Sequence, residues 1–343
     1  MPPRWVRRLV MPMVVVVFGL VVLVASPALA VLAVLASPLV PGRWVPLRLL
    51  GLLLLYLGRE CAGMTAAGWL WLASGFGRRL HTPEMQTRHY ALMSWFLGGL
   101  YTRATKLFNL TVDIEAADDG VEGPHSTQRP VVVLSRHSGP GDSFLLVQLL
   151  LDRYHRRPRI VMKSLLELDP CIDMIGHRLP HYFVEPRGRG TADFEQGIGS
   201  LAGDLPADGA LLLFPEGGNF TRGRRRKAIQ KLMDQGQVQE ALDAGRLRNL
   251  LPPRAAGAFA ALSAAPSADV LFVGHTGFGP ADDATAVWRA VPTDCRLRLR
   301  FWLVPAEDVP SGEDERVDWL YAWWARIDEW IDGARSPADE QAA

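Results

Sequence analysis

The 343-residue chain carries 37 basic and 36 acidic side chains, so its formal net charge is +1 and no global charge favours nucleic acid as a partner. Its length allows one large domain with an appendage, or two domains. The three cysteines Cys61, Cys171 and Cys295 lie far apart without CxxC spacing, which argues against a disulfide framework or a zinc knuckle and fits a reducing compartment for the main domain.

The N-terminal segment is apolar enough to cross a membrane. Residues 9–35 are almost wholly apolar, and a helix needs about 20 such residues to span a bilayer. Arg4, Arg7 and Arg8 precede this run, which favours a cytoplasmic position for that end. A cleaved signal peptide is the competing interpretation, because residues 28–30 (Ala-Leu-Ala) resemble a cleavage site. The apolar character continues past that site, which favours an uncleaved anchor.

A second apolar stretch follows at residues 45–76. Arg48 and residues 59–60 (Arg-Glu) interrupt it. A charge at bilayer depth costs at least about 2.5 kcal/mol, so this stretch either spans imperfectly or lies in the interface. Two arginines at residues 78–79 close the stretch. Arginines at both outer ends predict a membrane-anchoring helical hairpin over residues 1–80, with both chain termini and the main domain on the cytoplasmic face.

From residue 81 onward the pattern alternates between helices and strands. Short apolar runs predict strands at residues 131–134, 159–162, 182–184, 210–214, 270–273 and 297–304. Helical patterns lie at residues 81–110, 144–151, 191–205, 227–245 and 313–332. Strands separated by helices predict an α/β fold, with a mixed, largely parallel central sheet covered by helices. We expect a main domain at residues 81–333 and a disordered tail at residues 334–343.

A histidine and an aspartate follow the predicted strand at residues 131–134. His137 and Asp142 stand in H-x-x-x-x-D spacing, in a turn whose glycines allow the carboxylate to reach the imidazole. Sheets of this class commonly place active sites at such strand ends. A neutral imidazole accepts a proton from an alcohol, and a carboxylate on its other ring nitrogen fixes the tautomer. The same spacing also fits a turn histidine followed by a helix-capping aspartate.

A second turn, FPEGG at residues 214–218, follows the predicted strand at residues 210–214. Pro215 ends the strand, Glu216 places an acid at its end, and the two glycines allow the backbone to approach a ligand closely. An ordinary Pro/Gly turn is the alternative interpretation.

In combination and in this order, the H-x-x-x-x-D and F-P-E-G motifs resemble those of the glycerolipid acyltransferase superfamily. Residues 251–257 (LPPRAAG) resemble the L-P-R-T-x-G segment of the branch that holds the lysocardiolipin acyltransferases and their lysophosphatidic acid acyltransferase relatives. Residues 319–329 (WLYAWWARIDE) resemble the late W-L-x-x-x-W-x-x-K-D segment of that branch, with Ile327 in place of the lysine. The resemblance covers residues 80–332.

This resemblance implies an acyltransferase catalytic domain at residues 81–333. It implies transfer of a fatty acyl group from acyl-CoA or acyl carrier protein to the free hydroxyl of a lysophospholipid, such as 1-acyl-sn-glycerol 3-phosphate, in phospholipid biosynthesis or remodelling. His137 would be the general base and Asp142 its partner, while Glu216 and Gly217 would line the acceptor site.

The resemblance also implies an arginine contact for the acceptor phosphate. Arg187 stands in the segment that matches the second block of the family, and Arg189 is the second choice. A guanidinium suits phosphate because it donates in a fixed fork. Lys163, after the strand at residues 159–162, is expected to contact phosphate or the acyl carrier. A solvated loop of arginines is the alternative interpretation.

The chain departs from the family pattern after F-P-E-G. Many members continue with Thr-Arg, whereas Gly218 and Asn219 stand here, so Thr221 and Arg222 are the expected substitutes. The run from Arg222 to Lys227 holds five cations and no aromatic residue. Nucleic-acid binding would call for stacking aromatics among the charges, so we expect an anionic membrane surface as the partner of this run and no nucleic acid.

We expect direct transfer, in which His137 deprotonates the acceptor hydroxyl and the resulting oxygen attacks the thioester carbonyl. Backbone N–H groups near residues 139–141 or 217–218 are candidates for holding the oxyanion. No G-x-S-x-G elbow appears, and His177, His181 and His275 lack HExxH spacing, so we expect no cofactor and no metal. Two alternatives remain: a lipid or thioester hydrolase that uses the same pair to activate Ser135, Ser138 or water, and an inactive membrane scaffold of the same fold.

Overall fold

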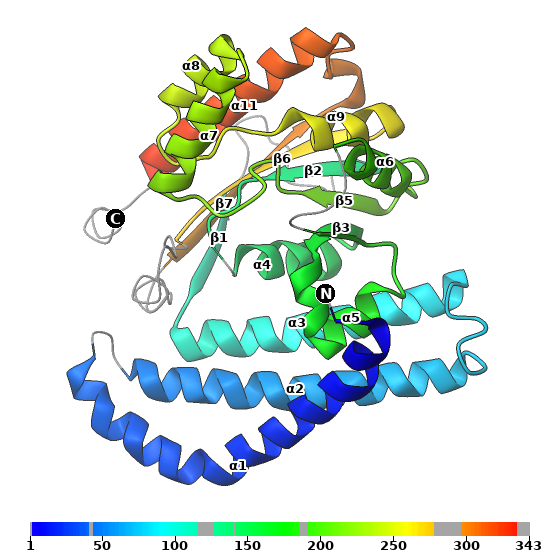
Figure 1. Ribbon diagram of the computed structural model, residues 1–343, viewed down its shortest axis with the longest axis vertical. Helices are drawn as coiled ribbons and strands as arrows, with labels where there is room; N and C mark the ends of the chain where they lie inside the picture. The colour runs from blue at the N-terminus through cyan, green and yellow to red at the C-terminus, as the bar shows by residue number, and fades with distance from the viewer. Residues whose placement is uncertain are drawn as a thin grey trace. The chain divides into compact units, whose positions relative to one another are not determined.

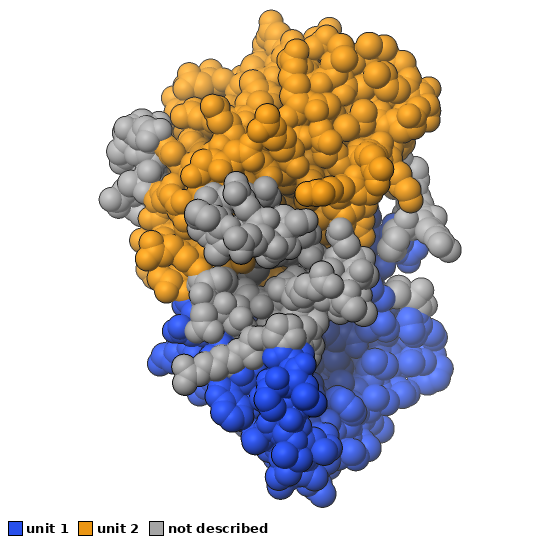
Figure 2. Space-filling model, turned by 90° about the vertical axis from the view of Figure 1, so that its left-hand side faces the viewer, with its two compact units in different colours: residues 1–110, 161–188 blue, residues 111–160, 189–343 orange. Residues whose placement is uncertain are grey.

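The computed structural model describes residues 2–40, 44–115, 127–139, 141–185, 191–277 and 296–334. The chain forms two compact units (Figure 2): unit 1 holds residues 1–110 and 161–188, and unit 2 holds residues 111–160 and 189–343. The predicted tail from residue 335 onward lies outside the described residues. The predicted boundary at residue 80, between a membrane-anchoring hairpin and a main domain, stays a prediction.

Unit 1 is built mainly from helices (Figure 1). Its elements are η1 (Val6–Val10), α1 (Met11–Ala36), η2 (Ser37–Leu39), α2 (Val45–Ala73), α3 (Pro83–Phe108), η5 (Ser164–Leu168), α5 (Pro170–Gly176) and strand β4 (Tyr182–Val184). Two stretches are long and apolar enough to cross a membrane, Val6–Leu39 and Val45–Ala73. The predicted helical pair at residues 9–76 is therefore present, as is the amphipathic helix predicted at residues 81–110.

The charges that interrupt α2 contact other helices of unit 1. The Arg59 side chain donates through Nε to the Phe96 carbonyl oxygen at 3.0 Å and lies 4.0 Å above the ring of Trp95. Glu60 is 1 % exposed and accepts the main-chain N–H of Cys171 at 2.7 Å. Because α3 and α5 supply these partners, neither charge has to face lipid.

Unit 2 is organised around the central sheet. The strands are β1 (Thr111–Glu115), β2 (Val131–Ser135), β3 (Arg157–Lys163), β5 (Gly209–Leu213), β6 (Asp269–Thr276) and β7 (Arg296–Val304). With β4, they form one seven-stranded sheet in the order β1-β7-β6-β2-β5-β3-β4. Among the described strands only β6 and β7 pair antiparallel, so the predicted mixed, largely parallel sheet is confirmed.

The boundary between the two units falls inside β3. Its residues 157–160 pair with β5 in unit 2, and its residues 161–163 pair with β4 in unit 1. Strands β2 and β5 are buried along their whole length, which explains why both read as continuous apolar runs in the sequence.

Helices cover both faces of the sheet in unit 2. They are α4 (Asp142–Gln148), η4 (Leu149–Arg153), α6 (Thr191–Ala202), α7 (Arg222–Asp234), α8 (Val238–Arg246), α9 (Ala255–Ala264), η6 (Ala306–Asp308) and α11 (Glu313–Ala334). Figure 1 shows α6, α9 and α11 on one face and α4 on the other. The aromatic face of α11 packs on β6, where the rings of Phe272 and Trp323 stack at 4.6 Å. This contact confirms that the aromatic stripe predicted at residues 313–332 belongs to the core.

Three features differ from the sequence-based expectation. The single helix predicted at residues 227–245 is two helices, because Gly236 adopts a φ of 76° and ends α7 with a left-handed cap. Strand β1 and helices α5 and α9 were not predicted, because their short or uniformly small side chains lack a clear period. The helix predicted at residues 144–151 begins at Asp142 and becomes π-helical from Leu149.

Candidate active site

His137 and Asp142 meet at the C-terminal end of β2. His137 lies two residues beyond this strand, and Asp142 is the first residue of α4. The imidazole Nδ1 is 2.9 Å from Asp142 Oδ2 and 3.1 Å from Oδ1. The turn between β2 and α4 therefore brings the two predicted catalytic side chains into hydrogen-bond contact. The His137 side chain is 16 % exposed, and its ring lies 4.7 Å from the ring of Phe214.

Asp142 is buried in a ring of donors from its own turn. Its carboxylate accepts the main-chain N–H groups of Ser138 (2.7 Å), Gly139 (3.2 Å) and Ser143 (2.6 Å) and the Ser143 hydroxyl (3.1 Å). Burial opposes ionisation of this group, but the hydrogen bond with His137 and the neighbouring donors lower the pKa of Asp142 to about 2. The carboxylate therefore stays ionised at neutral pH. It accepts a hydrogen bond from the Nδ1–H of His137. This assignment leaves Nε2 without a hydrogen, so Nε2 can accept a proton.

Glu216 connects the F-P-E-G turn to the backbone of His137. Its Oε1 accepts the main-chain N–H of His137 at 2.8 Å, and its Oε2 accepts that of Leu251 at 2.9 Å. Glu216 is 2 % exposed. Burial raises the pKa of its carboxyl to about 8, although the charge of Arg136 and the two N–H groups lower it. Both oxygens accept main-chain N–H groups, one of which belongs to His137, and the predicted place of Glu216 at the acceptor site stays a prediction.

The segments that follow the two motifs are joined by further backbone hydrogen bonds. The N–H of Phe220 donates to the His137 carbonyl oxygen at 2.9 Å, and the N–H of Arg254 donates to that of Pro215 at 2.9 Å. Three segments that are remote in the chain, around residues 137, 216 and 252, thus form one connected site in unit 2. The F-P-E-G and H-x-x-x-x-D motifs converge as the sequence predicts.

Gly217 and Gly218 have different positions in this turn. Gly217 adopts a φ of +67°, a left-handed conformation that favours glycine, and a Cβ built there would lie 2.8 Å from Arg254 Cζ, so the Arg254 side chain would have to move. The N–H groups of Gly139 and Gly217 already donate to Asp142 and to the Phe214 carbonyl oxygen. In the described part of the chain the N–H of Gly218 donates to no other group, which makes it the better candidate for an oxyanion.

The other predicted binding residues have more varied positions. Arg187 and Arg189 lie outside the described residues. Lys163 is the exposed last residue of β3, in unit 1. Thr221 caps α7 by accepting the N–H of Arg224 at 3.0 Å, and Arg222 is exposed at the first position of that helix.

Sequence reasoning did not assign roles to two residues of this site. Arg254 is an exposed cation whose guanidinium lies against Gly217, and its position inside the LPPRAAG segment is the signal that could have identified it. His275, at the end of β6, is buried with its Nε2 3.6 Å from Asp142 Oδ2. No local pattern marks His275, because its neighbours in the chain are strand residues.

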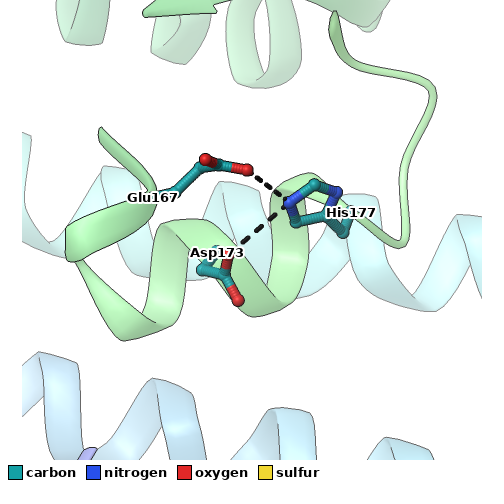
Figure 3. Close-up of side chains that lie close together, drawn as sticks. All are labelled: Glu167, Asp173 and His177. Carbon is teal, nitrogen blue, oxygen red and sulfur yellow. Dashed lines mark hydrogen bonds and ion pairs between the residues drawn. The ribbon is translucent and has the colours of Figure 1, made fainter. Parts of the chain in front are cut away.

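Unit 1 holds a cluster of potential metal ligands, formed by Glu167, Asp173 and His177 (Figure 3). His177 Nε2 lies 2.8 Å from Glu167 Oε1 and 3.5 Å from Asp173 Oδ1. Arg7 donates to Glu167 and to Asp173, both at 3.1 Å, and Arg8 donates to Asp173 at 3.3 Å. Because two guanidinium groups already neutralise these buried carboxylates, the cluster anchors the N-terminal segment and is not an open ligand set. The expected absence of a metal stays a prediction.

Comparison with known proteins points to one family. Residues 120–273, which contain both motifs, match the family model described as Acyltransferase. No curated protein matches the chain. Among solved structures, the chain is similar to the 1-acyl-sn-glycerophosphate (LPA) acyltransferase PlsC from Thermotoga maritima, with 15% sequence identity and a TM-score of 0.50 over 84% of this chain and 99% of that one. At this identity the likeness shows a shared fold.

Proposed function

We propose that the chain is a member of the glycerolipid acyltransferase superfamily and acts as a lysophospholipid O-acyltransferase, because residues 120–273 match the Acyltransferase family model. The proposed reaction moves a fatty acyl group from acyl-CoA or acyl carrier protein to the free hydroxyl of a lysophospholipid such as 1-acyl-sn-glycerol 3-phosphate. One observation carries the proposal: Glu216 of the F-P-E-G turn holds the backbone of His137, whose ring is paired with ionised Asp142.

The mechanism begins at Nε2 of His137, the ring nitrogen that does not face Asp142. With Nδ1–H donated to Asp142, Nε2 removes the proton of the acceptor hydroxyl. The oxygen attacks the thioester carbonyl, and the Gly218 N–H is the proposed donor to the oxygen that becomes negative. The carbon–sulfur bond then breaks, and the thiolate takes the proton from Nε2. The ionised Asp142 stabilises the imidazolium between these two proton transfers. This sequence needs no cofactor and no metal.

Recognition of the acceptor phosphate is assigned to arginine side chains. Arg187 and Arg189 stay proposed contacts, with Lys163, Thr221 and Arg222 as further candidates. Arg254 joins them, because its guanidinium lies beside Gly217 and forms no ion pair among the described residues. A guanidinium held near the turn can donate to phosphate in a forked arrangement.

We propose that the protein is bound to a membrane through α1 and α2, with the acyltransferase domain on the cytoplasmic face. Helix α7 is the proposed contact with anionic lipid. It carries Arg222, Arg224, Arg225, Arg226, Lys227 and Lys231, buries no side chain, and forms no ion pair within the described residues. Each such charge near an anionic surface contributes about 1 kcal/mol.

A hydrolase that uses serine as nucleophile is less well supported. Ser135 Oγ donates to the Arg136 carbonyl oxygen at 2.9 Å, and Ser138 Oγ is buried. Among the described residues neither hydroxyl is hydrogen-bonded to the His137 ring, which a serine nucleophile activated by that histidine would need. Water activation by the same pair and an inactive scaffold remain alternatives, and the following experiment separates them.

The deciding experiment measures thiol release from acyl-CoA, and separately from acyl carrier protein, by the full chain in detergent or vesicles. Each donor is combined with a panel of lysophospholipids, and the lipid products are identified by mass. We expect thiol release that depends on the acceptor and gives the diacyl product. Thiol release without acylated lipid would indicate a hydrolase, and no release in any combination would indicate a scaffold.

A further inference from the structure

His275 lies at the end of β6, beside the turn that carries His137. Parallel pairing of β2 with β6 runs up to Ser135 and Val273. Continuing this register by two residues brings His275 level with His137. His275 is 1 % exposed, and its Nε2 is 3.6 Å from Asp142 Oδ2. A second histidine therefore lies at the same carboxylate as the first.

The proton of His275 can be assigned from its contacts with Arg136. The main-chain N–H of Arg136 donates to the Val273 carbonyl oxygen at 3.2 Å, and its Nη1 donates to that of His275 at 2.5 Å. In return, His275 Nε2 is 3.3 Å from the Arg136 carbonyl oxygen. A carbonyl oxygen only accepts, so Nε2 carries the hydrogen. The same N–H then faces Asp142.

The buried position of His275 keeps its ring uncharged. Burial and then the charge of Arg136 lower the pKa of His275 to about 4, while Asp142 raises it and His137 lowers it. At neutral pH the ring is uncharged. Its Nε2–H therefore faces the carboxylate at 3.6 Å without competing with His137 for the role of charged partner.

The origin of the donors to Asp142 gives His275 a distinct role. The hydrogen-bond donors to Asp142 are His137, Ser138, Gly139 and Ser143, and all of them lie in the same turn as Asp142. They move with that turn and cannot fix the carboxylate relative to the sheet. His275 comes from a different strand, and β6 is packed against α11 at Gly274.

We propose that His275 is a positioning residue, whose Nε2–H donates to the Arg136 carbonyl oxygen and faces the Asp142 carboxylate at 3.6 Å, so that Asp142 meets His137 in one orientation. This inference rests on the proposed acyl transfer for its kinetic consequence. Its structural consequence, the effect on His137 protonation, does not depend on any substrate.

The experiment compares three variants of the full chain. His275→Gln places an amide nitrogen where Nε2 lies, His275→Asn places it where Nδ1 lies, and His275→Phe removes the donor while keeping a ring. We expect His275→Gln to keep kcat within about threefold of wild type, and His275→Asn and His275→Phe to lose about 10- to 100-fold, with the KM of both substrates nearly unchanged. The acid limb of the rate–pH profile should move to higher pH in the last two, because a carboxylate that no longer faces the N–H dipole of His275 attracts the His137 proton more strongly.

The same proteins are titrated by NMR of ¹⁵N-labelled histidine. Wild type should show His275 as the neutral Nε2–H form at pH 7, and the His137 titration midpoint should rise in His275→Asn but not in His275→Gln. Equal kcat and equal His137 midpoints in His275→Gln and His275→Asn would overturn the proposal, as would an Nδ1–H form of His275. The NMR test of His275 does not depend on activity. A wild-type protein that releases no thiol would count against the proposed function and not against the role of His275.

Discussion

Glu216 accepts the main-chain N–H of His137 at 2.8 Å, so a carboxyl group in one strand-end turn holds the backbone of the histidine in another. The two residues come from β-strand ends that are neighbours in the sheet, because β2 pairs with β5. This contact explains in physical terms why the two motifs act together. The F-P-E-G turn sets where the imidazole stands, and Asp142 sets its tautomer.

Removing either member of the dyad should reduce acyl transfer and leave the fold intact. We expect His137→Ala to lower kcat by about 10²–10⁴-fold, because the proton acceptor is lost. Asp142→Asn should lower it by on the order of 10³–10⁴-fold, because an amide no longer fixes the tautomer or stabilises the imidazolium. The measurement is thiol release with thermal unfolding alongside. His81→Ala, at an exposed position, is the matched control, and turnover near wild type in His137→Ala would reject the mechanism.

Glu216→Gln should lower both activity and stability. An amide offers one oxygen and one NH₂, so either the His137 or the Leu251 N–H would face a donor and lose its acceptor. We expect a loss of about 1–3 kcal/mol in the free energy of unfolding and a fall in kcat. Glu329→Gln, on an exposed position of α11, should change neither quantity.

The same carboxyl should make stability depend on pH. Its pKa is about 8 in the folded chain and lies near 4.5 in the unfolded chain, so between these values only the folded state retains the proton. The free energy of unfolding should therefore fall as pH rises from about 5 to 8. Denaturant titrations of wild type and Glu216→Gln test this, and an identical slope with pH in both proteins would exclude Glu216 as its source.

Arg7→Ala should destabilise unit 1. Arg7 is 8 % exposed and neutralises Glu167 and Asp173, which are also buried. Removing one partner of a buried ion pair costs about 3–5 kcal/mol, because a buried charge is left uncompensated. Arg4→Ala, at an exposed position nearby, is the control and should unfold like wild type. Equal melting temperatures for the two variants would show that the ion pairs contribute little.

Arg254→Ala should raise the KM of acceptors that carry a phosphate. Loss of a charged hydrogen bond corresponds to about 10- to 100-fold, and the KM of the acyl donor should not change. Initial rates with 1-acyl-sn-glycerol 3-phosphate and with a monoacylglycerol make the comparison. A parallel rise of KM for the acceptor without phosphate would mean that Arg254 shapes the turn instead of binding phosphate.

Neutralising α7 should weaken binding to anionic membranes. The variant replaces Arg226, Lys227 and Lys231 with Gln and keeps the helix length and its Thr221 cap. Each charge contributes about 1 kcal/mol, so at moderate salt a smaller fraction of the variant than of wild type should bind to vesicles rich in anionic lipid. Neutral vesicles should bind both proteins equally. The proposed insertion of α1 and α2 would occur in both kinds of vesicle, so the comparison uses a short incubation on preformed vesicles and measures the bound fraction against salt.

Local sequence patterns predicted most of the helices and strands. Continuous apolar runs identified β2, β5 and β6 because these strands are buried along their whole length, and the helical period identified α11 because a helix with one apolar face must pack. The same local logic joined α7 and α8 into one helix, since a lone glycine inside a charged run does not show in advance that it will adopt a positive φ.

The amino-acid sequence alone determined the α/β class, the apolar N-terminal pair of helices and the two motifs, because each depends on residues close together in the chain. The roles of Glu216, His275 and Arg7 were decided only by tertiary structure. Each of these side chains is buried, and its partner comes from a segment remote in sequence. A buried polar group must find a hydrogen bond or an opposite charge wherever packing provides one, and no local pattern records which segment that will be.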